Sequence, residues 1–145
     1  MKSDVKNFEE FILEKVSSEI KKDNKHAEVA IKSLDLRNQM HIFHWQTLNG
    51  KHHDALSDFY EDFLDKIDEL IEYTMGKYGR FSIDGLEQTK LVDYDDEKCC
   101  DLLQDYHDYY QELKDGLYKN DDAMTAVLDV MMGDILKLKY ILSME

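Results

Sequence analysis

Several features that would indicate other classes of protein are missing from this sequence of 145 residues. It has no proline and only six glycines, so few residues in it could break a helix. It has no run of about 18 apolar residues, and we therefore expect no membrane-spanning helix. The stretch from Met1 to Asp4 also lacks the apolar segment of a secretory signal, which predicts a cytoplasmic protein.

Cysteines and positive charges are scarce as well. The two cysteines, Cys99 and Cys100, are adjacent, and neighbouring cysteines can form only a strained disulfide. We expect one thiol in the core and one at its boundary, with a redox or metal-binding role as the alternative. The net charge is -14 and there is no basic N-terminal tail, so we expect neither DNA nor a membrane as a partner.

The sequence is rich in helical periodicity. Apolar residues recur at spacings of three and four in five segments, which cover about residues 5–20, 27–47, 53–78, 99–117 and 124–142. Residues 23–25 are expected to end the first helix. The acids at 93–96 suit the start of the fourth helix, and Asn120 or Asp121 can cap the fifth. The pattern predicts an all-helical protein.

The lengths of the connections suggest how these helices are arranged. Only short links join the second helix to the third and the fourth to the fifth, whereas a long segment from about residue 80 to residue 96 lies between the two pairs. Two helical hairpins joined by a long crossover are one topology of the ferritin-like four-helix bundle. We therefore predict a single domain, with a ferritin-like bundle over 27–145 and an extra N-terminal helix over 1–26.

Polar residues that could carry chemistry lie on the second and third predicted helices. On a helical wheel, one line beside the apolar residues of the third helix holds His53, Ser57, Glu61, Asp68 and Glu72. The second helix adds His41, His44 and Trp45. Imidazole and carboxylate together suit Fe(II), Mn(II) or Zn(II). The simpler alternative is that the acids are surface residues and that His41 is a hydrogen-bonded boundary residue.

The stretch from residue 41 to residue 79 resembles the Dps proteins, which are mini-ferritins of the ferritin-like superfamily. A His-Trp pair is followed in that family by a histidine, by an aspartate 15 residues later and by a glutamate four residues after that. The matching residues here are His44, Trp45, His53, Asp68 and Glu72. The sequence departs from the family at Ser57, where an acidic residue is common, at Tyr73, where an arginine is common, and in having no basic tail.

The resemblance implies a ferroxidase, an oxidoreductase that oxidises Fe(II) with peroxide or oxygen. It further implies iron storage as Fe(III) inside a hollow dodecamer, and protection against oxidative stress. His44 and His53 of one subunit would then face Asp68 and Glu72 of a two-fold-related neighbour, with Trp45 near the site.

Two alternatives stay open. His41 and Glu61 could build a relocated metal site inside one bundle, as in the larger ferritins. The chain could also be a non-catalytic helical assembly protein that has a ferritin-like fold and a degraded metal site.

Overall fold

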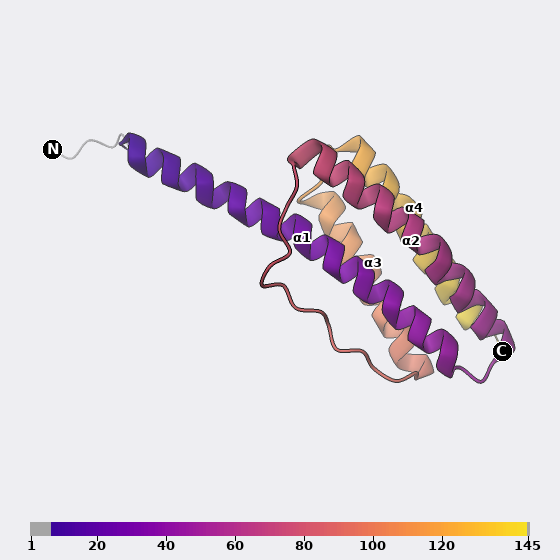
Figure 1. Ribbon diagram of the computed structural model, residues 1–145. Helices are drawn as coiled ribbons and strands as arrows, with labels where there is room; N and C mark the ends of the chain where they lie inside the picture. Colours follow the sequence, from indigo (N-terminus) through magenta and orange to yellow (C-terminus); the bar gives the residue numbers. More distant parts are fainter. Residues whose placement is uncertain (1–6, 145) are drawn as a thin grey trace.

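A computed structural model describes residues 7–144, apart from the side chains of residues 16–24 (Figure 1). This part of the chain is all-helical, which confirms the prediction from periodicity, and it contains no strand. Its helices are α1 (Phe8–Gln46), α2 (Gly50–Tyr78), α3 (Asp96–Asp115) and α4 (Asp122–Leu142). None of these helices, over the residues described, is long and apolar enough to cross a membrane.

The first two predicted helices are in fact one. The predicted break at residues 23–25 is wrong, because α1 continues without interruption from Phe8 to Gln46. Neither proline nor glycine occurs within α1, and an Asp or Asn inside a helix costs less than about 0.7 kcal/mol relative to alanine. The predicted extra N-terminal helix over 1–26 is therefore, from residue 8 onward, the first part of α1, and residues 1–6 lie outside the described chain.

The other helix ends follow local signals in the sequence. The Asn49 side chain caps α2 by accepting hydrogen bonds from the backbone amides of residues 51 and 52, so this helix begins three residues before the expected His53. Gly79 ends α2 with a φ of 90°, a conformation that favours glycine. Asp95, one of the acids at 93–96 expected at a helix start, caps α3, and Asp121, one of the two candidate caps, caps α4.

The helices pack side by side around one core. Helix α1 packs on α2, α2 packs on α4, and α4 packs on α3. Figure 1 shows that α1 and α2 run in opposite directions, as do α3 and α4. The largest fully buried side chains include Phe43, Phe63, Leu70, Tyr110, Leu128 and Met131. Each helix therefore contributes to a single apolar interior.

The predicted crossover occupies residues 79–95 and runs along the outside of α1 (Figure 1). Gln39 of α1 holds it with both ends of its amide: Nε2 donates to the Val92 carbonyl at 2.8 Å, and Oε1 accepts from the Val92 amide at 2.9 Å. Two further backbone amides donate to α1, from Thr89 to Asp35 at 2.8 Å and from Tyr94 to Gln46 at 2.6 Å.

Candidate metal centre

His44 and His53 meet where α1 ends and α2 begins. Their imidazole rings stack with centroids 3.7 Å apart and planes at 24°. Each ring also reaches the backbone of the other residue. His44 Nδ1 lies 2.7 Å from the His53 carbonyl, and His53 Nδ1 lies 2.8 Å from the His44 carbonyl. We call this reciprocal pair the histidine clasp.

The clasp fixes which ring nitrogens are available. A carbonyl oxygen can only accept a hydrogen bond, so both Nδ1 atoms must carry the proton. In the neutral rings, each Nε2 then holds a lone pair. A histidine whose Nδ1–H is fixed by a backbone carbonyl is in the tautomer used by histidines that bind metals through Nε2. His44 is half-buried and His53 is exposed, so the clasp lies at the surface.

Aromatic residues extend from the clasp. The His41 ring stacks on Tyr60 with centroids 3.9 Å apart and lies 4.5 Å from the ring of Trp45. The Tyr60 ring in turn lies 5.4 Å from His44, in an edge contact. Trp45 itself is 64% exposed. The predicted near-site tryptophan therefore stands beside the candidate centre, on its solvent side.

His41 and Glu61, the residues of the relocated site, are electrostatic neighbours. Burial lowers the pKa of His41, and the charges of Arg37 and His44 lower it further, while the Glu61 carboxylate acts in the opposite direction. Glu61 is exposed on α2. Among the residues whose side chains are described, no three His, Cys, Asp or Glu come together in an arrangement that could hold a metal ion.

Asp68 and Glu72 lie far from the clasp of their own chain. Both are exposed on α2. The 15 residues from His53 to Asp68 correspond to about 22 Å of helix at 1.5 Å per residue. One chain therefore does not bring the predicted histidines and acids to a common ion, and the subunit-spanning arrangement stays a prediction.

The acids of α2 form a wider stripe than the sequence line suggested. Spacings of four and three connect six exposed carboxylates on the outer surface of this helix: Asp54, Asp58, Glu61, Asp65, Asp68 and Glu72. Of the predicted line, Glu61, Asp68 and Glu72 belong to this exposed set, whereas Ser57 is half-buried. Like charges three or four residues apart destabilise a helix by a few tenths of a kcal/mol each, roughly. We call this set the acidic stripe.

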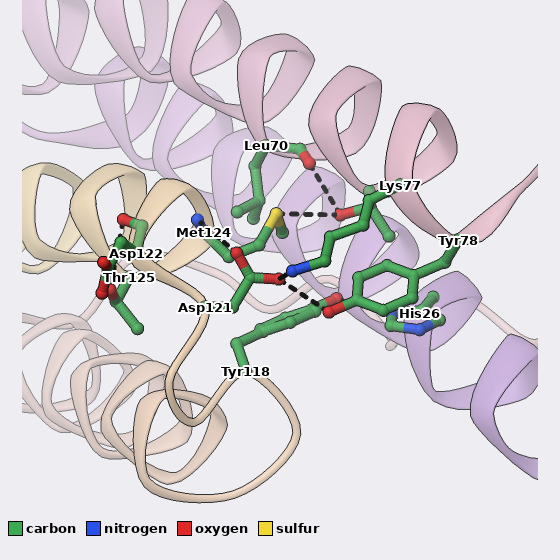
Figure 2. Close-up of polar contacts among 10 residues, drawn as sticks. His26, Leu70, Lys77, Tyr78, Tyr118, Asp121, Asp122, Met124 and Thr125 are labelled. Carbon is green, nitrogen blue, oxygen red and sulfur yellow. Dashed lines mark hydrogen bonds and ion pairs between the residues drawn. The ribbon is translucent and has the colours of Figure 1, made fainter.

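A second polar cluster lies at the opposite end of the helices, around Asp121 (Figure 2). One carboxylate oxygen of Asp121 accepts from Lys77 Nζ at 2.8 Å and from the Tyr78 hydroxyl at 2.6 Å. The other accepts from the Met124 amide. Burial acts to raise the pKa of Asp121, but the hydrogen bonds from these three groups outweigh it and lower the pKa below its usual value.

His26 joins this cluster from α1. It is 2% exposed, and its Nδ1 lies 2.8 Å from the Tyr118 hydroxyl. Its ring stacks on Tyr78 at 4.5 Å between centroids, as Figure 2 shows. Sequence reasoning identified Asp121 only as a cap and gave no role to the other members. They are far apart in the chain, so no local pattern could have connected them.

The cysteines agree with the expectation of one core thiol and one boundary thiol. Cys99 is buried and Cys100 is half-buried, and both are free. Burial raises the pKa of Cys99 to about 12, with smaller contributions from Cys100 and Asp96. The Cys99 thiol is therefore protonated at neutral pH and suits the core better than a role in thiol chemistry.

Comparison with known proteins gives one family. A family model described as a family of unknown function (DUF5856) matches residues 44–142. The matched range begins at His44 and also contains His53, Asp68 and Glu72. No curated protein and no solved structure matches the chain.

Proposed function

The chain belongs to the family of unknown function DUF5856, and we propose that it is a Dps-like mini-ferritin that oxidises and stores iron. In this proposal the four helices form a ferritin-like bundle, and the bundles assemble into a hollow homo-oligomer. Fe(II) is the substrate and peroxide or oxygen is the oxidant. The single observation that carries the proposal is the histidine clasp.

The clasp supports metal binding because its hydrogen bonds serve two purposes. They hold two rings in place without a metal, and they leave both Nε2 lone pairs available to a cation. Iron would be held at these two nitrogens, which belong to rings whose centroids are 3.7 Å apart.

The chain topology supports the fold part of the proposal. Helices α1 and α2 form one antiparallel hairpin, α3 and α4 form the other, and residues 79–95 cross the length of the helices between them (Figure 1). This is the connectivity of ferritin-like bundles with one long crossover.

The carboxylates of the site would come from a second copy. Asp68 and Glu72 are exposed and lie about 22 Å and about 28 Å along α2 from His53 of their own chain, so an ion at the clasp needs acids from elsewhere. In the peroxide reaction, two Fe(II) ions each give up one electron to one molecule of hydrogen peroxide. Its O–O bond breaks, and with two protons it leaves as two waters. The Fe(III) produced is the cargo of the hollow oligomer.

Mixed oligomers would test the shared site directly. One variant combines His44→Ala with His53→Ala, and the other combines Asp68→Ala with Glu72→Ala. Fe(II) is added without air, peroxide follows, and the ferric absorbance is recorded. We expect each variant alone to oxidise iron at least about tenfold more slowly. Refolding the two together should restore activity, because one interface then combines intact histidines with intact acids.

A matched control uses acids of the same stripe that are outside the proposed site. Asp54→Ala with Asp65→Ala removes equal charge from the same helix face and should leave the oxidation rate unchanged. If the Asp68 and Glu72 variant keeps the rate of the original protein, these two residues are not ligands. If both site variants are slow and the mixture stays slow, the site is not shared between subunits.

Ser57 favours a second candidate function, a non-catalytic helical assembly protein. This half-buried residue stands one turn after His53, at a position where the Dps resemblance leads us to expect an acid. Such a protein would form oligomers but bind no iron at stoichiometric levels. Equilibrium dialysis against Fe(II) without oxygen, followed by iron analysis, would separate it from the mini-ferritin.

A further inference from the structure

The first part of α1 projects beyond the other helices (Figure 1). We call residues 8–25 the arm. Every side chain described in residues 8–15 is exposed, and four of them are large and apolar: Phe8 is 77% exposed, Phe11 is 55%, Ile12 is 39% and Leu13 is 66%. His26, near the point where the arm joins the rest of α1, is 2% exposed. An isolated helix of this length is marginal in water, so the arm needs a surface to pack on.

A suitable surface lies between α2 and α4. A groove of about 600 Å³ is open there, and its floor and walls include Tyr73, Gly76, Ala123, Ala126, Val127 and Val130. Two of these side chains are exposed to solvent, Tyr73 to 45% and Val130 to 46%. The glycine and alanines leave room for larger side chains from another helix. We call this feature the α2–α4 groove.

We propose that the arm of one copy docks in the α2–α4 groove of a second copy, so that two chains exchange arms. The first support is position. The arm leaves the core at His26, which stacks on Tyr78 at the end of α2 (Figure 2), and the groove opens beside the same part of α2. A two-fold axis that sets two copies end to end would carry each arm back along the other copy's groove, as in an isologous dimer.

Size and shape provide the second support. The groove follows α2 from Lys66 to Lys77, which is about 16 Å of helix, and the arm provides about 25 Å. Phe8, Phe11 and Ile12 are spaced by three and one, which places them together on one face of the arm. Large side chains on the arm would thus meet small ones in the groove.

Charge provides the third support. The exposed acids of the arm include Glu9 and Glu10, and the groove's α2 edge offers Lys66, whereas Lys77 is already paired with Asp121 at 2.8 Å. Lys66 contacts Glu69 only at 3.8 Å and at the surface, so a change of partner costs little. Lys15 of the arm can in turn approach Glu69 on the same edge. The proposal involves neither clasp histidine and does not rest on the iron-binding function.

Disulfide trapping between two single-cysteine proteins would test the docking. Both carry Cys99→Ala and Cys100→Ser; one adds Phe11→Cys and the other, with a size tag, adds Ala126→Cys. Mixing and mild oxidation should give a disulfide-linked heterodimer on a non-reducing gel. Leu136→Cys, at an exposed position of α4 outside the groove lining, is the matched control and should give none.

Point variants would measure the contribution of the contact. Phe8→Ser with Phe11→Ser empties the arm face, and Ala126→Arg fills the groove; both changes are at exposed positions, so circular dichroism should show an intact fold. We expect the dissociation constant from light scattering to rise at least about tenfold for each. The proposal would be overturned if light scattering showed the original protein to be a monomer, or if both variants left its measured mass unchanged. It would also be overturned if disulfides formed only between two arms. The two proposals are tested separately. A protein that oxidises iron but does not exchange arms would contradict only the docking proposal, and one that exchanges arms but does not oxidise iron would contradict only the iron proposal.

Discussion

Histidines occupy both ends of the helical core, and their surroundings differ. At one end, His26 is 2% exposed and lies among Tyr78, Tyr118 and the network of Asp121. At the other end, His44 and His53 each hydrogen-bond to the other's backbone carbonyl and lie at the surface. The first cluster joins segments that are distant in sequence, whereas the second joins residues nine positions apart. We infer that the Asp121 end mainly holds the fold and that the clasp end is open to a ligand.

The largest expected effect is at Asp121. Asp121→Ala removes a helix cap and leaves Tyr78 without its acceptor, so we expect the free energy of unfolding to fall by about 2–3 kcal/mol. Asp95→Ala is the matched control, because it removes the exposed cap of α3 and should cost about 1 kcal/mol. Urea unfolding followed by circular dichroism measures both. Equal losses would show that the Asp121 network adds nothing beyond capping.

The clasp should contribute less to stability. His53→Ala removes one hydrogen bond and one stacked ring at the surface, so we expect a loss of about 0.5–1 kcal/mol in metal-free protein. His44→Ala should cost a similar amount. Because the two rings stabilise each other, the double variant should lose less than the sum. A double-mutant cycle from urea unfolding gives the coupling, and strictly additive losses would contradict mutual support.

Acid should affect stability at the two ends over different pH ranges, with the smaller effect at His41, beside the clasp. The pKa of His41 is lowered, so the unfolded chain binds a proton more readily, and stability should decline as pH falls below about 6.5. The pKa of Asp121 is also lowered, so its contribution should be lost only below about pH 4. Thermal unfolding at a series of pH values would show both ranges.

Single substitutions assign these two steps. His41→Gln should remove the decline between pH 7 and pH 5, which we expect to be less than about 1 kcal/mol because the ring is only partly buried. Asp121→Asn keeps a cap but removes the charge, and should remove the step at low pH. If His41→Gln leaves the curve near pH 6 unchanged, another group causes that decline.

The sequence predicted those parts of the fold that depend on neighbouring residues. Apolar spacing located the helices, and Asn120 and Asp121 were recognised as candidate caps, of which Asp121 is the cap, because caps act within one turn. The break at residues 23–25 was predicted wrongly, because weak helix propensities do not by themselves end a helix that lacks proline and glycine. The N-terminal part of α1 was therefore assigned to a separate helix.

The candidate site was predicted in part for a similar reason. The resemblance to the Dps proteins selected His44 and His53 together, and the structure brings the two rings into contact. The sequence could not show that each ring donates a hydrogen bond to the other residue's carbonyl, because that depends on how the α1–α2 turn folds. The partners of His26 could not be found either, since Tyr118 lies 92 positions away.

The hydrogen bonds between the crossover and α1 determine where the crossover can accept inserted residues. The Gln39 side chain makes hydrogen bonds to both the amide and the carbonyl of Val92. The backbone amides of Thr89 and Tyr94 donate hydrogen bonds to other α1 side chains. An inserted residue between 89 and 94 would move one of these groups away from its partner. An insertion near the exposed turn at Gly85 would shift none of them, so natural variation in length and engineered tags are best placed there.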